Sequence, residues 1–288
     1  MKVQLKEKPC RVLFDGRYVW VSNWDTDNVY KIDTATNEVV ATIRVETWPS
    51  DICFDDTHVW VCNHDSNNVH KINAATNEVA ATIEVGENPV RMCFDGTHIW
   101  VCNWGSYTVS KIDVATNEVV ATVRVGMDPI GICFDGTYVW VCNWGSNTVF
   151  KINAVTNEVI AIIKVGECPS SICLNERYVF VCNCYSHNVT KINAETNEVV
   201  ATIKTPAYPE KIWVGKNIWI FCEYLKNLCI IDKQNNELVK NVCVGEHTQI
   251  FPDGKYVWIS KSQDDYYTLE RGDERDLIRL VISNALVS

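Results

Sequence analysis

Residues 131–170 read GICFDGTYVW VCNWGSNTVF KINAVTNEVI AIIKVGECPS, and this stretch decides the fold. Related stretches follow one another with a period of 40 residues, and the copies begin near residues 11, 51, 91, 131, 171, 211 and 249. The sixth copy needs a one-residue deletion, and the seventh is the most divergent. Because 288/40 is 7.2, seven copies account for nearly the whole chain. Repetition at this period is typical of an array of one supersecondary unit.

Each copy is predicted to form four short strands and no helix. In the quoted copy, the strands are expected over residues 132–134, 138–143, 148–153 and 159–165. The first two are joined at Asp135-Gly136, a pair that favours a type I′ hairpin turn. The second strand is rich in aromatic and β-branched residues, which suit a packed sheet. Asn157 tolerates the left-handed backbone of the last turn, and Gly166 and Pro169 separate the copies.

Such a small sheet has two apolar faces and cannot bury both of them alone, so neighbouring copies must cover them. A ring of radial sheets does this and leaves only short, protected edges. The sequence therefore predicts an all-β, seven-bladed β-propeller with four antiparallel strands per blade, as a single domain over residues 1–288. An aromatic residue at one position of the second strand is expected to pack between blades, at Trp20, Trp60, Trp100, Trp140, Phe180, Trp219 and Trp258.

The chain begins with the sequence of a fourth strand. Residues 3–9 align without a gap with residues 43–49. We predict that segment 1–10 is a closing strand that joins the last blade and latches the ring. Residues 277–283 align equally well with a fourth strand, which is one strand more than seven blades require. Either the segment from about Asp273 is displaced as a fifth strand or a helix, or the N-terminal strand is peripheral.

Composition narrows the class of protein. The 36 acidic and 26 basic side chains give a net charge of −10, which argues against nucleic-acid binding. No run approaches the roughly 20 apolar residues of a membrane span, and the first residues resemble no signal peptide. Most of the 14 cysteines occupy repeated positions, as small buried hydrophobes do, and none has metal-site spacing. We expect a cytoplasmic monomer without cofactor, metal, nucleic-acid or membrane partner.

The repeat resembles a known family. VWVCN, GSNTV, VFKIN, AVTNEV and IIKVGECP in the quoted copy are similar to the motifs of the YVTN family of β-propeller repeats, which includes YncE-like proteins. The resemblance covers about Val3 to Gly245 clearly and the remainder faintly. It implies a propeller of about seven four-stranded blades but no single activity, since members are mostly binding or surface proteins.

Functional residues are expected where the copies differ, because shared positions build the blades. In propellers, the loops between second and third strands and the passages between blades gather at the channel mouth. We predict that this face binds a protein or peptide partner, or a small ligand, through aromatic and charged side chains. The candidates are Trp24, His64, Trp104, Trp144, Tyr185, Tyr224, Arg11, Asp51, Arg91 and Lys211. Two alternatives remain open: the tryptophans cap the blade ends, or Arg11, Asp51 and Arg91 only neutralise one another.

The chain has no recognisable catalytic motif, such as GxSxG, a phosphate-binding GxxxxGK[ST] loop or haem-binding CxxCH. We therefore predict a non-enzymatic propeller with no catalytic residue. The alternative is a lyase-type propeller enzyme, similar to virginiamycin B lyase, with metal-assisted chemistry by a His and a carboxylate. His64 precedes Asp65, but adjacent loop side chains are expected to point apart. A His–carboxylate pair within bonding distance favours the enzyme.

Overall fold

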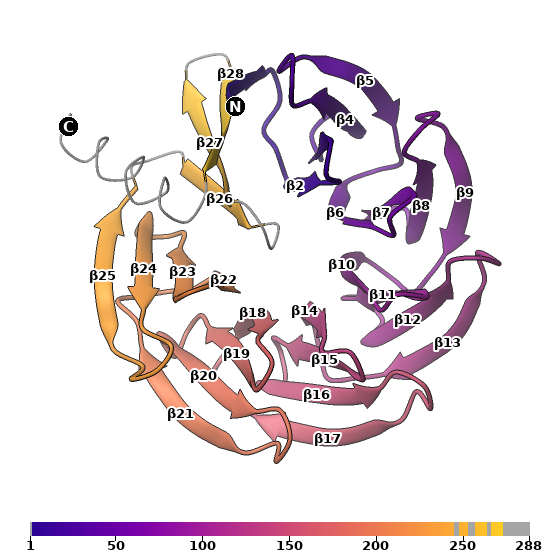
Figure 1. The fold of residues 1–288 in the computed structure, drawn as a ribbon. Helices are drawn as coiled ribbons and strands as arrows, with labels where there is room; N and C mark the ends of the chain where they lie inside the picture. The colour runs from indigo at the N-terminus through magenta and orange to yellow at the C-terminus, as the bar shows by residue number, and fades with distance from the viewer. Residues whose placement is uncertain (1, 245–247, 253–256, 264–265, 273–288) are drawn as a thin grey trace. The chain divides into compact units, whose positions relative to one another are not determined.

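The computed structural model describes residues 2–244, 248–252, 257–263 and 266–272. Every regular element in these residues is a β-strand, and the strands form seven four-stranded sheets (Figure 1). Neighbouring strands within a blade run antiparallel, as β15 (Tyr138–Asn143) and β16 (Thr148–Asn153) do. The fold is the seven-bladed β-propeller that the repeat predicts.

The strands follow the sequence repeat blade by blade. The first blade contains β2 (Arg11–Phe14), β3 (Tyr18–Asn23), β4 (Asn28–Asp33) and β5 (Val39–Arg44). The second contains β6 (Pro49–Phe54), β7 (His58–Asn63), β8 (Asn68–Asn73) and β9 (Val79–Glu84). The third contains β10 (Pro89–Phe94), β11 (His98–Asn103), β12 (Thr108–Asp113) and β13 (Val119–Arg124). The fourth adds β14 (Pro129–Phe134) and β17 (Val159–Lys164) to β15 and β16.

The remaining blades are less regular in sequence. The fifth contains β18 (Pro169–Leu174), β19 (Tyr178–Asn183), β20 (Asn188–Asn193) and β21 (Val199–Lys204). The sixth contains β22 (Lys211–Val214), β23 (Ile218–Cys222), β24 (Asn227–Ile231) and β25 (Leu238–Cys243). The seventh contains β26 (Thr248–Pro252), β27 (Val257–Gln263), β28 (Tyr266–Gly272) and, from the other end of the chain, β1 (Lys2–Leu5).

The structure divides into two compact units. Of the described residues, unit 1 comprises 2–122 and those within 249–272, and unit 2 comprises 123–244 and 248. Unit 1 therefore holds blades 1 and 2, nearly all of blade 3 and the seventh blade, and unit 2 holds blades 4 to 6.

The N-terminal strand completes the seventh blade, as predicted. β1 pairs antiparallel with β28, with Val3 opposite Leu269, and the two strands are adjacent in Figure 1. Val3 and Leu5 are buried and pack in one cluster with Val12 and Val19 of the first blade. The segment from about Asp273, whose displacement as a fifth strand or a helix is one of the two alternatives above, lies outside the described residues.

The first hairpin of the blades differs from the predicted type I′ turn. In the fourth blade the Asp135 N–H donates to Tyr138 O, so Gly136 and Thr137 are the two central residues. Gly136 has a positive φ of 96°, whereas Thr137 does not have a positive φ. A positive φ at the first central position alone is the pattern of a type II′ turn. The first strand is also longer than predicted, because a bulge between Pro129 and Gly131 lets the proline join the sheet.

Replacing Asp56 by glycine should stabilise the protein. Asp56 occupies the second blade's equivalent of Gly136 with a φ of 73°, a left-handed conformation that strains a residue with a Cβ. Asp56→Gly is expected to gain about 1 kcal/mol and raise Tm by roughly 3 °C in a thermal melt. An unchanged or lower Tm would contradict this account of the turn.

The aspartate of this turn also binds the central aromatic residue of its blade. Asp55 Oδ1 accepts the backbone N–H of Thr57 and His58, and its Oδ2 accepts the indole N–H of Trp60 at 2.8 Å. The same indole bond recurs in blades 1, 3 and 4, at 2.7 Å. In the fifth blade, where Phe180 has no N–H to donate, Asn175 replaces the aspartate. In the fifth blade the two positions therefore differ together from those of the first four blades.

Acid should weaken the blades through these carboxylates. Burial raises the pKa of Asp55 and Asp95, but their combined hydrogen bonds outweigh it and lower both pKa values overall. A depressed folded-state pKa contributes stability that is present above the unfolded value near 4 and is lost as pH falls through the folded value. We expect urea midpoints to fall as pH drops below about 4. Asp55→Asn/Trp60→Phe, which reproduces the blade 5 pair, should lessen this fall, and an equal acid dependence in both proteins would contradict the assignment.

The cores lie between successive blades, as the aromatic repeat predicts. Trp20 packs with Val59 and Val61 of the second blade, and Trp140 packs with Val179 and Val181 of the fifth. The repeated aromatic residues from the first to the sixth blade are all buried: Trp20, Trp60, Trp100, Trp140, Phe180 and Trp219. Trp258, the seventh residue of this series, is not among the side chains that the structure describes.

Buried lysines tie each blade to the next within a unit. Lys31 Nζ donates to Ala74 O at 2.6 Å and to Asn77 Oδ1 at 3.0 Å, and Lys151 makes the same pair of bonds to Ala194 and Asn197. Asn77 has a positive φ of 66°, as expected for this turn residue. The turns that contain Asn77 and Asn197 are therefore also docking points for the preceding blade.

None of the 14 cysteines forms a disulfide. Burial raises the pKa of Cys53 to about 12 and that of Cys62 well above its ordinary value, so these thiols stay neutral. No helix among the described residues is long and apolar enough to cross a membrane.

Candidate functional site

Loops and interblade passages meet at one end of the blades. The His64 N–H donates to Trp48 O at 3.0 Å, and the Trp104 N–H donates to Asn88 O at 2.9 Å. Each bond joins the loop after a second strand to the passage that enters the same blade. The repeat thus places variable residues of both kinds side by side, as the sequence predicts.

An aromatic row crosses this end of unit 1. The ring centroids of Trp24 and Trp48 are 5.7 Å apart, those of Trp48 and His64 are 4.9 Å apart, and those of His64 and Trp104 are 6.5 Å apart. These spacings are typical of interacting aromatic pairs. Three of the four residues are predicted candidates, and Trp48 is an addition that the structure makes.

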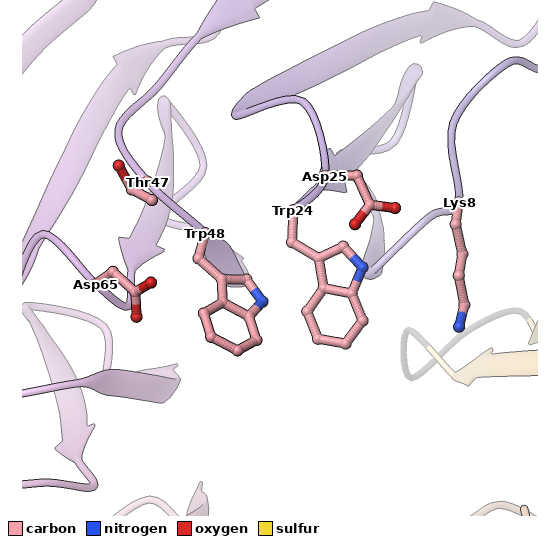
Figure 2. Close-up of a pocket in the computed structure, with 6 residues that line it drawn as sticks. All are labelled: Lys8, Trp24, Asp25, Thr47, Trp48 and Asp65. Atoms are coloured by element: carbon pink, nitrogen blue, oxygen red, sulfur yellow. The ribbon is translucent and has the colours of Figure 1, made fainter.

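A pocket of about 480 Å³ opens at one end of this row. Its lining consists of Lys8, Trp24, Asp25, Thr47, Trp48 and Asp65. Figure 2 shows the two indole rings side by side and pointing the same way, with Asp25 beside Trp24 and Asp65 beyond Trp48. Two carboxylates against one ammonium group give this pocket a formal charge of −1.

The backbone of Trp48 is clamped in an unfavourable conformation. Its φ is 61°, which is uncommon for any residue with a bulky side chain. Its N–H donates to Asp27 Oδ1 at 3.0 Å, and its carbonyl accepts the His64 N–H. The indole nevertheless stays 40% exposed. The same left-handed conformation occurs at Asn88, Asp128, Cys168 and Tyr208, so it belongs to the repeated passage between blades.

His64 and Asp65 form a pair, contrary to the expectation that they point apart. His64 Nδ1 lies 2.6 Å from Asp65 Oδ1. The turn between β7 and β8 brings the two side chains to the same side, because the His64 and Asp65 amides are both held by the passage through Trp48 O and Thr47 O. If Nδ1 donates to the carboxylate, Nε2 carries the lone pair.

Arg11, Asp51 and Arg91 also come together in unit 1, from β2, β6 and β10. Arg11 Nε lies 3.0 Å from Asp51 Oδ1. Asp51 Oδ2 accepts the N–H of Met92 at 2.9 Å. Burial lowers the pKa of Arg91, Arg11 lowers it further, and Asp51 opposes both.

A second aromatic row lies in unit 2. Ring centroids are 5.7 Å apart for Trp144 and Tyr185, 6.2 Å for Tyr185 and Tyr208, and 5.2 Å for Tyr208 and Tyr224. Nearby, burial together with a hydrogen bond to Glu223 and its charge raises the pKa of Glu210 to about 7. Lys211, the remaining candidate, lies at the start of β22, with its Nζ 5.9 Å from the Phe221 ring.

Sequence reasoning missed Trp48 and Tyr208. Both precede the proline that starts a new blade, where the other copies carry Asn88, Asp128 and Cys168. All five of these residues have a positive φ. The signal was present as two aromatic residues at a position that otherwise holds smaller side chains. No group of three or more His, Cys, Asp or Glu side chains that could hold a metal ion occurs among the residues that the structure describes.

Comparisons with known proteins show the fold alone. No family model matches the sequence, and no curated protein matches it. Hydrazine synthase of Kuenenia stuttgartiensis is similar in structure, with a TM-score of 0.75 and 19% identity over 92% of this chain and 95% of that one. Dihydro-heme d1 dehydrogenase NirN in complex with DHE has a TM-score of 0.72 and 16% identity over 96% of this chain. This chain spans 65% of that protein, and at these identities both are relatives in fold only.

Proposed function

We propose that this chain is a binding propeller whose pocket at Trp24 and Trp48 holds a cationic group of a peptide, protein or small ligand. The observation that carries the proposal is the pair of indole rings lining a pocket that also contains Asp25 and Asp65. A cation over an indole face gains about 0.5–2 kcal/mol, and neighbouring carboxylates add attraction. Lysine, arginine or quaternary ammonium groups have the required chemistry.

The clamped backbone supports this proposal. Because the N–H and the carbonyl of Trp48 are both hydrogen-bonded, the backbone that carries the ring is fixed before any ligand arrives, which reduces the ordering cost of binding. The net charge of −10 on the chain also favours the approach of cations over that of anions.

Tetramethylammonium is the simplest probe of this pocket. Titrating the full chain with tetramethylammonium chloride, against sodium chloride at equal ionic strength, should change tryptophan fluorescence saturably. Trp24→Ala/Trp48→Ala should weaken binding roughly tenfold or more, since it removes both rings. Asp25→Asn/Asp65→Asn should weaken it less.

Trp144→Ala is the matched control. Trp144 occupies the same repeat position as Trp24 but belongs to unit 2 and does not line the pocket. Its loss should leave the affinity unchanged. Equal binding by the wild type and the Trp24→Ala/Trp48→Ala protein, with both folded by circular dichroism, would exclude the pocket.

The second candidate function is a lyase-type enzyme, and the His64–Asp65 pair favours it. At 2.6 Å the carboxylate can orient the imidazole so that Nε2 acts as a general base. The structural neighbours hydrazine synthase and NirN are enzymes by name, so the fold is compatible with catalysis. Incubation with virginiamycin B and Mg²⁺, followed by liquid chromatography, tests it: loss of the antibiotic that His64→Gln abolishes would support the enzyme, and an unchanged antibiotic would oppose it.

Membership of the YVTN family and a cytoplasmic location are also proposals. The motifs VWVCN, GSNTV and AVTNEV support the family. The 14 cysteines, none of them in a disulfide, support a reducing compartment.

A further inference from the structure

The cluster of Arg11, Asp51 and Arg91 in unit 1 carries a net positive charge. Arg11, Asp51 and Arg91 bring two guanidinium groups against one carboxylate, which leaves a formal charge of +1. The side chains of Arg11 and Asp51 are only 19% and 11% exposed, so solvent screens this charge poorly. The neighbouring Cys62 thiol adds no negative charge, because burial raises its pKa well above the ordinary value.

The single carboxylate is already fully engaged. Asp51 Oδ1 faces Arg11, and Oδ2 is fixed to the backbone of β10 by the Met92 N–H. Asp51 is therefore held in a defined position beside Arg11, and its carboxylate cannot also give Arg91 a two-pronged partner.

Donor groups of both arginines remain for another acceptor. Arg11 Nε is buried and, despite its 3.0 Å approach to Asp51, makes no well-directed hydrogen bond within the described residues. Arg91 Nη1 donates to the carbonyl of its own neighbour, Val90, at 2.7 Å. A guanidinium carries five N–H donors in a planar fork that matches a carboxylate.

We propose that Arg11 and Arg91 bind the carboxylate group of a small organic acid through the N–H donors that Asp51 leaves unused. A monoanion neutralises the charge of +1, whereas a dianion such as phosphate reverses it. Two guanidinium forks also match the planar carboxylate better than they match a spherical halide. This site is separate in chemistry from the cationic-group pocket and does not depend on it.

Acetate is the probe of the test. The full chain is titrated with ¹³C-acetate, observed by NMR line broadening, against chloride at equal ionic strength. Saturable binding is expected, and Arg11→Gln and Arg91→Gln should each weaken it at least tenfold. Arg44→Gln, which removes the same charge from an exposed position on β5, should leave it unchanged.

The variant Asp51→Asn best separates the proposal from the alternative, because the two predict different effects on acetate affinity. The asparagine can still accept the Met92 N–H but removes the competing negative charge, so acetate should bind several-fold more tightly. A cluster that only neutralises itself predicts no saturable acetate binding in the wild type. That result would overturn the proposal, as would weaker acetate binding by Asp51→Asn.

Two further variants keep the test decisive if Arg91→Gln does not fold and separate it from the test of the cationic-group pocket. If Arg91→Gln fails to fold, Arg91→Lys keeps the charge without the planar fork and should still weaken acetate binding; wild-type affinity in this variant would overturn the proposal. Trp24→Ala/Trp48→Ala should leave acetate binding intact while it loses tetramethylammonium binding, so the two proposals succeed or fail separately.

Discussion

Deleting Lys2–Leu5 is expected to lower Tm by about 10 °C or more. The deletion strips β28 of its outer partner and exposes the cluster that contains Val3 and Leu5. Each buried aliphatic side chain contributes about 1.5–3 kcal/mol, and 1 kcal/mol corresponds to about 2–4 °C in a protein of this size. The measurement is a thermal melt followed by circular dichroism, which reports the cooperative loss of the sheets.

Point variants along the same strand provide the control. Leu5→Ala should cost about 2–5 kcal/mol, because Leu5 is 2% exposed. Gln4→Ala, one residue away on the exposed face, should change stability by less than about 0.5 kcal/mol. If both the deletion and Leu5→Ala melt like the wild type, β1 does not hold the seventh blade.

The substitution Trp60→Ala, which removes the indole, should lower the free energy of unfolding by about 3–5 kcal/mol, measured by urea unfolding. Trp60 is fully buried between the second and third blades, and its N–H donates to Asp55. Trp60→Phe keeps much of the volume but leaves Asp55 Oδ2 without this donor, while the Asp55 side chain is only 3% exposed. A buried carboxylate that loses its partner is costly.

The fifth blade supplies the compensating change. Asn175 and Phe180 occupy these two positions there, and Asn175 Oδ1 still accepts the backbone N–H groups of Arg177 and Tyr178. Asp55→Asn/Trp60→Phe should therefore be more stable than Trp60→Phe by about 1 kcal/mol or more. If the changes in the free energy of unfolding are additive in this double-mutant cycle, the two positions are not coupled, which would contradict this account.

The blades could be predicted from the repeat because the strands that pair within a blade follow one another in the sequence. Period, turn residues and apolar alternation placed the second and third strands of the fourth blade at 138–143 and 148–153, where β15 and β16 lie. The N-terminal strand was also predictable, since its sequence matches a fourth strand. The type II′ turn was missed because its central pair starts at Gly136 rather than at Asp135.

The site was less predictable because its contacts join separate copies. Trp24 and Trp48 are in contact only because a passage between blades folds back against a loop of the preceding blade. Periodicity reveals which residues share a repeat position. Blade packing decides which residues from different repeat positions come into contact. The same holds for Arg11, Asp51 and Arg91, whose shared position was visible and whose 3.0 Å ion pair was not.

The most direct measurement of the central claim is ¹⁹F NMR of the chain with 5-fluorotryptophan at its 11 tryptophans. Trp24→Phe and Trp48→Phe assign the two pocket resonances, and Trp144→Phe assigns the control. On addition of tetramethylammonium, the Trp24 and Trp48 resonances should shift saturably, and those of Trp144 and the buried tryptophans should stay in place. Saturable shifts at Trp144 with none at Trp24 and Trp48, or no shift at any tryptophan, would contradict a cation-binding pocket at this end of unit 1.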